Sequence, residues 1–76
     1  MVVAYVMVKA ASGDADRIRE SIRDLDGVAE AHIVAGDMDF VVTVDVADPT
    51  DVKRVAADGI QGIAGVEDTQ TYIAMG

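Results

Sequence analysis

Hydrophobic positions follow two different periods along the chain, and their order predicts strand, helix, strand, strand, helix, strand. Runs rich in β-branched residues predict strands over 2–10, 28–35, 40–46 and 66–75. Between these runs, apolar residues recur at the three- and four-residue spacing of amphipathic helices. They are Ile18, Ile22 and Leu25 in the first stretch, and Val52, Val55, Ala56, Ile60 and Ile63 in the second.

The residues beside the two helical stretches predict where each helix begins and ends. Ser12-Gly13-Asp14 offers capping oxygens to the first helix, and Asp48-Pro49 opens the second with a cap and a proline at its first position. Glycines within 59–65 weaken the end of the second helix, so we expect its last turns to fray. Because this stretch follows a helix rather than a strand, it lacks the context of a phosphate-binding loop.

The two halves of the chain resemble each other at an offset of 38 residues. Leu25-Asp26-Gly27-Val28 falls on Ile63-Ala64-Gly65-Val66, so in both halves a glycine suited to a left-handed cap ends the helix before a strand. Two right-handed βαβ units predict the ferredoxin-like α+β plan, a four-stranded antiparallel sheet with both helices on one face. We expect a single domain over residues 1–76.

Alternation along the strands assigns their side chains to the two faces of the sheet. The residues predicted to lie under the helices are Val2, Ala4, Val6, Val8, Phe40, Val42, Val44 and Val46. The opposite face carries an apolar group larger than a monomer usually leaves in water. That group is Val3, Tyr5, Met7, Val41 and Thr43. We therefore expect two sheets to pack face to face, as a dimeric α+β barrel, which would also add stability to a small core.

The charge pattern narrows the classes of partner. Fourteen acidic residues, eleven of them Asp, face six basic ones, for a formal net charge of −8. Direct binding of nucleic acid or of an anionic membrane is not expected, because few cations are present to displace counterions. Abundant Asp with two lysines, Lys9 and Lys53, suits a halophilic source, although an ordinary acidic surface has the same composition. Without cysteine, signal peptide or long apolar run, we expect a cytoplasmic protein lacking disulfides.

One short segment concentrates candidate chemistry at the predicted hairpin between the second and third strands. Gly36, Asp37, Met38 and Asp39 could hold a ligand amine through Asp and present N–H groups to a carboxylate, but the same residues also form ordinary turns. Thr69 and Thr71 could hydrogen-bond a ligand, although Thr is common in strands. The single histidine, His32, makes a weak metal or catalytic candidate and is predicted to be a partly exposed strand residue, so no metal or cofactor is expected.

The hairpin and the last strand carry a resemblance to a known family. The matching segments are Ala4-Tyr5-Val6-Met7-Val8, 27–32, 34–40, and Gly65-Val66 followed by Thr69-Gln70-Thr71. They resemble the effector-binding domain of Lrp/AsnC transcription regulators, also called the RAM domain. The resemblance implies dimers paired through their sheets, which join into rings and bind amino acids where dimers meet.

The resemblance also implies a site and a role. It places Gly36, Asp37, Met38 and Asp39 along the effector site with Thr69 and Thr71 opposite, and Met38 stands where the family usually has Tyr. Full-length regulators carry a helix-turn-helix domain in front, whereas three residues precede Ala4, so the chain resembles a stand-alone form that does not read DNA itself.

Two classes of function remain open on the sequence. The first is a non-enzymatic regulatory module that binds an amino acid or co-assembles with full-length Lrp-like regulators. The alternative is a cofactor-free enzyme of the dimeric α+β-barrel type, built from one His, one Phe and two Tyr. Within the repeat, Ala31 and Ile33 fall on Thr69 and Thr71, which predicts one site per chain, completed by a neighbouring subunit.

Overall fold

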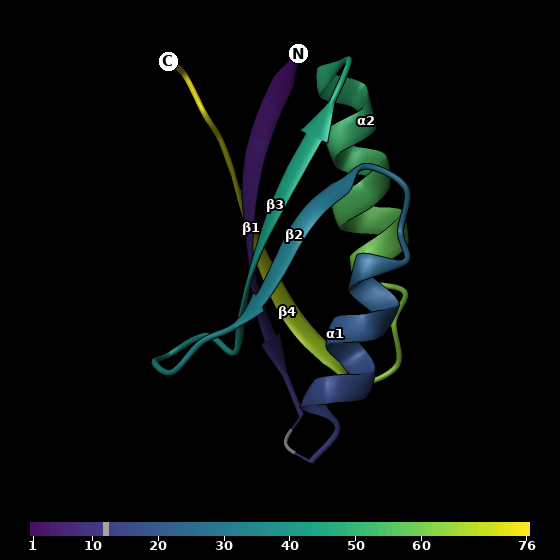
Figure 1. Cartoon of the computed structure of the whole chain (residues 1–76), viewed down its shortest axis with the longest axis vertical. Helices are drawn as coiled ribbons and strands as arrows, with labels where there is room; N and C mark the ends of the chain where they lie inside the picture. Colours follow the sequence, from purple (N-terminus) through teal and green to yellow (C-terminus); the bar gives the residue numbers. More distant parts are fainter. Residues whose placement is uncertain (12) are drawn as a thin grey trace.

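The strands and helices follow the predicted order in a computed structural model, which describes residues 1–11 and 13–76. The strands are β1 Val2–Ala10, β2 Val28–Ile33, β3 Phe40–Val46 and β4 Val66–Ile73, and the helices are α1 Ala15–Arg23, α2 Pro49–Lys53 and the π-helical η1 Arg54–Ile60, which continues α2. The strands form one antiparallel sheet in the order β2-β3-β1-β4, and the helices cover one of its faces (Figure 1). The predicted ferredoxin-like α+β fold is confirmed.

The hydrophobic core lies between the helices and the sheet. In the register of the two central strands, Val8 lies opposite Phe40 and Val6 opposite Val42. The residues buried on this face are Ala4, Val6, Val8, Ala31, Phe40, Val42 and Val44, while Val2 and Val46 at one end are half-buried. The helices complete the core with Ile18, Ile22, Val52, Val55, Ala56 and Ile60. The predicted faces of the sheet and of both helices are therefore confirmed.

The repeat is also visible in the backbone at the two helix ends. Gly27 and Gly65 both have φ of +99°, and each lies directly before a strand. A Cβ added at Gly27 would lie 2.9 Å from Cγ2 of Val55, and one at Gly65 would lie 3.0 Å from Cδ1 of Ile18. Each glycine therefore allows close packing against the helix of the other half.

We expect Gly27→Ala and Gly65→Ala each to lower the free energy of unfolding by more than about 1 kcal/mol, because alanine is strained at positive φ and its Cβ also meets a buried side chain. Urea denaturation followed by circular dichroism measures the loss. Gly13→Ala is the matched control, since Gly13 has φ of +104° but nothing lies within 4 Å of an added Cβ. Equal losses in the free energy of unfolding at all three positions would show that close packing against the added Cβ does not contribute to the effect.

Some predicted boundaries are wrong. β2 ends at Ile33 rather than at residue 35, because the chain turns into the hairpin, where Val34 N donates to Asp39 O at 2.9 Å. β4 ends at Ile73 rather than at residue 75. After Ile73, Ala74 N still donates a backbone hydrogen bond to Val3 O.

The predicted cap of the first helix is also wrong where it can be assessed. Asp14 occupies the N-cap position, but its side chain accepts no capping hydrogen bond, and its Oδ2 instead lies 3.5 Å from Nη2 of Arg17. The backbone of Asp14, with φ of −122° and ψ of 30°, also lies outside the extended region that capping residues usually adopt. Ser12 lies outside the described residues.

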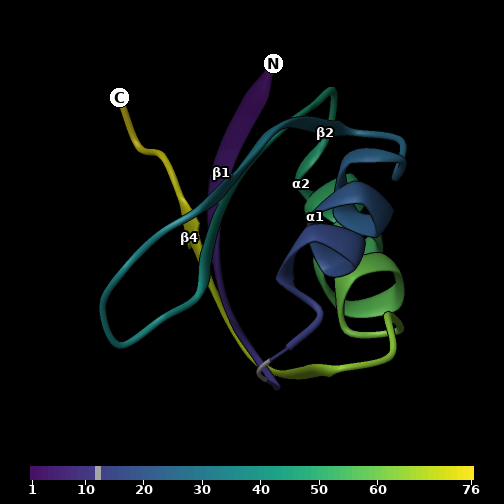
Figure 2. The same ribbon diagram turned by 60° about the horizontal axis from the view of Figure 1, so that its bottom comes forward.

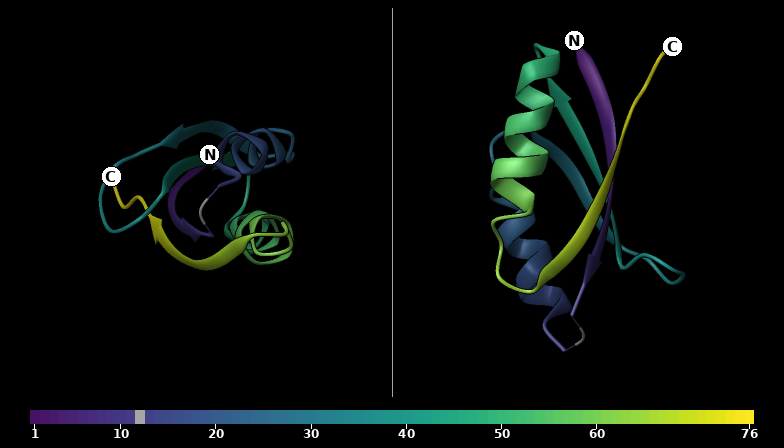
Figure 3. Two further views of the ribbon diagram at one scale, coloured as in Figure 1. Left: turned by 90° about the horizontal axis from the view of Figure 1, so that it is seen from below. Right: turned by 180° about the vertical axis from the view of Figure 1, so that it is seen from behind.

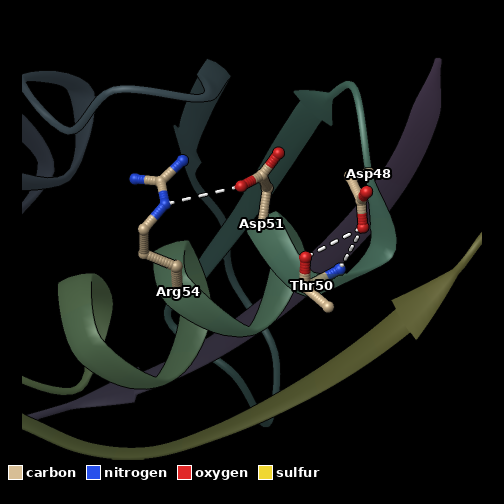
Figure 4. A network of polar contacts seen from close by, with 4 residues as sticks. All are labelled: Asp48, Thr50, Asp51 and Arg54. Carbon is tan, nitrogen blue, oxygen red and sulfur yellow. Dashed lines mark hydrogen bonds and ion pairs between the residues drawn. The ribbon is translucent and has the colours of Figure 1, made fainter.

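The second helix begins as predicted. The Asp48 carboxylate accepts hydrogen bonds from Thr50 N at 3.0 Å and from Thr50 Oγ1 at 2.8 Å (Figure 4). These bonds, the backbone one first, hold the pKa of Asp48 below its usual value. In the next turn, Arg54 Nε lies 3.7 Å from Asp51 Oδ1. The helix continues through the π-helical segment η1 and ends at Ile60, where a turn follows. Fraying of its last turns stays a prediction.

Candidate functional site

The hairpin between β2 and β3, residues 34–39, projects from the side of the sheet that faces away from the helices (Figure 2). Gly36 has φ of +152° and Asp37 is exposed, while Met38 is half-buried. Lys9 Nζ donates a hydrogen bond to the backbone oxygen of Asp37 at 3.4 Å, which leaves the Asp37 carboxylate exposed at the tip. The hairpin therefore presents one acidic group to solvent.

The other carboxylate of this hairpin, that of Asp39, is engaged in a hydrogen bond within the fold. Its Oδ2 accepts a hydrogen bond from Ala10 N at 2.8 Å, and its own N–H donates to Val8 O at 2.9 Å. These bonds lie where the pairing of β1 with β4 shifts register, between Lys9 and Ala10. Asp39 therefore ties the hairpin to the irregular end of β1. Nothing in the sequence distinguishes this aspartate from its neighbour two residues earlier.

The strand-four threonines lie on the other side of the sheet. Thr69 is opposite Val8 and Thr71 is opposite Val6, so both side chains belong to the helix-side face of β4. Gln61 Nε2, just beyond η1, donates to Thr69 Oγ1 at 2.7 Å. Because the hairpin projects in the opposite direction (Figure 3), one chain does not bring the predicted hairpin and threonine residues together.

A small cavity of about 110 Å³ lies at the base of the hairpin, where Asp39, Ile33 and Phe40 meet the loop before α1. Of the six predicted site residues, this cavity includes Asp39. Ordinary ligand pockets have volumes of about 300–1,000 Å³. The hairpin of a single chain is therefore too open at its tip and too tight at its base to enclose an amino acid.

The open face of the sheet, opposite the helices, keeps the predicted apolar group. Tyr5 lies opposite Tyr72, and these side chains are 42% and 55% exposed. Met7 lies between Val41 and Gln70 in the centre of the same face. His32 is an exposed strand residue, as predicted, and its Nε2 lies 2.8 Å from Glu30 Oε1.

Two further properties concern the part of the chain that the structure describes. No helix within residues 1–11 and 13–76 is both long and apolar enough to cross a membrane. Over the same residues, no group of three or more His, Asp or Glu side chains is placed to hold a metal ion.

The fold is that of the ligand-binding domains of a family of transcription regulators. The chain belongs to the Lrp/AsnC ligand binding domain family, which matches residues 3–76. The resemblance found in the sequence is thereby confirmed, and it extends over nearly the whole chain.

Individual relatives agree with this assignment. The leucine-responsive regulatory protein of Haemophilus influenzae is 27% identical over 75 residues, which cover 99% of this chain and 45% of that protein. TTHA0845 from Thermus thermophilus has a solved structure with a TM-score of 0.94 and 32% identity, covering 99% of this chain and 94% of that one. The regulator NMB0573 of Neisseria meningitidis, solved with L-Met, has a TM-score of 0.85 at 19% identity, covering 99% and 50%, and shares the fold. The chain thus spans less than half of the curated regulator and nearly all of the Thermus protein.

Proposed function

We propose that this chain is a non-enzymatic regulatory module that self-associates through the open face of its sheet and binds an amino acid between subunits. The hairpin of one chain supplies one wall of the site, and Thr69 and Thr71 of a chain in a neighbouring dimer supply the other, because these threonines lie on the helix side of the sheet rather than on the paired open face. The observation that carries the proposal is the separation of these two groups on opposite sides of one sheet. The relatives named for leucine response and solved with L-Met support an amino acid as the ligand class.

The hairpin has the chemistry to hold both ends of an amino acid. The exposed Asp37 carboxylate pairs with the ligand ammonium, and N–H groups at the tip face the ligand carboxylate. Met38, with an unbranched and polarizable side chain, lines the space for the ligand side chain. Asp39 keeps the hairpin in place through Ala10.

A thermal-shift screen of the full chain in high salt tests the proposal, with each standard amino acid as the probe. At least one should raise the melting temperature, since a ligand at 100 times its Kd adds about 2.7 kcal/mol to the free energy of unfolding. If none stabilises the chain, amino-acid binding is rejected. Co-assembly with full-length Lrp-like regulators would then remain as its role, to be tested by pull-down from the host.

Asp37→Asn and Asp39→Asn should separate ligand binding from folding. Asp37→Asn is expected to leave the ligand-free stability within about 0.5 kcal/mol and to remove the shift caused by the amino acid. Asp39→Asn should lower the ligand-free stability by about 1 kcal/mol, because the neutral amide oxygen is a weaker acceptor for Ala10 N than the carboxylate. Urea denaturation and the same thermal-shift assay measure both effects. If an amino acid raised the melting temperature of Asp37→Asn as much as that of the unsubstituted chain, Asp37 would not be the partner of the ligand ammonium.

The alternative of a cofactor-free enzyme would be favoured by a cavity that unites His32 with Tyr5 or Tyr72. A hollow of about 520 Å³ does include Tyr5, but it is formed with residues at the two chain ends, and His32 does not line it. His32 instead pairs with Glu30 on the open face. The geometry therefore supports the regulatory role over the enzymatic one.

A further inference from the structure

A groove separates the second helix from strand β4 on the helix side of the sheet. It has a volume of about 350 Å³, within the range of small-molecule sites. We define this α2–β4 groove by Val52, Lys53, Ala56, Gln61, Thr71 and Ile73. β4 starts beside the helices and leaves them toward its C-terminal end, as Figure 3 shows, and this divergence explains why the groove stays open.

The groove has an apolar floor and a few polar groups at its rim. Val52 and Ala56 are 3% and 6% exposed, whereas Ile73 is 46% exposed and keeps a free apolar surface. Gln61 uses its amide nitrogen on Thr69, which leaves its amide oxygen to face a ligand. The walls therefore suit a small molecule with an aliphatic body and one polar end.

The charge of the groove differs from that of the remaining surface. Lys53 lines it, and none of the lining residues is acidic, although the chain carries fourteen carboxylates. Throughout residues 1–11 and 13–76, the ion pairs involve Arg17, Arg23, Arg54 and His32 as cations, so the Lys53 ammonium is unpaired. A cation without acidic neighbours favours an anionic ligand.

We propose that the α2–β4 groove is a second ligand site, which takes a short aliphatic carboxylate without an amino group, such as a 2-oxo acid. The ligand carboxylate pairs with Lys53, its aliphatic chain packs on Ile73, and its oxo group accepts from the Thr71 hydroxyl. An ammonium group would find no carboxylate here, in contrast to the hairpin with Asp37. The groove is complete within one chain and lies opposite the open face. It shares Thr71 with the proposed intersubunit site, whereas Val52 and Ala56 belong to the groove alone.

Titration of the ¹⁵N-labelled full chain in high salt tests this assignment, with 4-methyl-2-oxopentanoate and L-leucine as probes. The 2-oxo acid should shift the amide signals of Val52, Ala56 and Ile73, which belong to the groove and not to the proposed amino-acid site, and leucine should not. Lys53→Gln should weaken 2-oxo acid binding about tenfold, as expected for loss of a charge-assisted hydrogen bond, while Lys53→Arg should retain it. Lys9→Gln is the matched control, because it removes the other lysine, which lies beside the hairpin. Ala57→Leu, at another lining position, should narrow the groove and also weaken binding.

Several results would overturn the proposal. Equal shifts of Val52, Ala56 and Ile73 with leucine and the 2-oxo acid would show that the groove does not select against an ammonium group. Equal losses of 2-oxo acid affinity in Lys53→Gln and Lys9→Gln would show that Lys53 has no specific role. A change of molar mass in Ala57→Leu, without carboxylate binding by the unsubstituted chain, would show that a second copy occupies the groove. Amide shifts at residues 36–39 report amino-acid binding at the hairpin separately, so either site can fail without the other.

Discussion

Phe40→Ala is expected to lower the free energy of unfolding by about 3–5 kcal/mol, the usual cost of removing a buried aromatic ring. Phe40 is fully buried, and it lies between Val8 of β1 and Ile33 of β2 in the sheet. A core of this size supplies about 3–5 kcal/mol in total. The substitution should therefore leave the isolated chain largely unfolded, which urea denaturation followed by circular dichroism would show.

The controls for Phe40→Ala separate the core from the site and from association. Phe40→Leu keeps an apolar side chain and should cost clearly less, while Asp37→Asn at the hairpin tip should cost almost nothing. Because the proposed self-association would stabilise the folded state by mass action, raising the protein concentration should restore part of the structure. A variant that remains fully folded as a monomer would show that other parts of the chain hold the fold without this ring.

The fold could be predicted in detail because hydrophobic residues alternate clearly in the strands and recur every three or four residues in the helices. The predicted bounds of β1 and β3 agree with the structure residue for residue, since β-branched residues fill both strands and their alternation places one face under the helices. The end of the second helix was less predictable. Gly59 and the following turn indicate weakness there, but periodicity does not distinguish an α-helix from the π-helical segment η1.

The residues of the candidate site could be named from the sequence, but their arrangement in space could not be predicted. Asp37 and Asp39 are chemically identical, and their different roles arise from contacts with β1, where the side chain of Asp39 meets a backbone 29 residues away. The partner of Thr69 is Gln61, which no motif indicates. The α2–β4 groove depends on how β4 diverges from the helix, a property of the twisted sheet rather than of any short segment.

The proposed role makes assembly a condition of binding. In one chain the hairpin and the threonines of β4 face opposite directions, so an amino acid that needs both must bridge two chains. The apolar open face gives a reason for the chains to associate in the first place. A variant that prevents association should therefore abolish amino-acid binding even though every hairpin residue is intact.

Met7→Glu is expected to convert the proposed assembly into a monomer of 8.0 kDa, measured by light scattering after size-exclusion chromatography. Met7 lies in the centre of the open face between Val41 and Gln70, where a paired sheet would bury an unpartnered carboxylate at a cost of several kcal/mol. Ala15→Glu adds the same charge to an exposed position on α1 and should leave the molar mass unchanged. Stabilisation by amino acids should disappear in Met7→Glu and persist in Ala15→Glu. If Met7→Glu stays multimeric, the chains associate through another surface, whereas a monomer that still binds amino acids would mean that one chain forms the site alone.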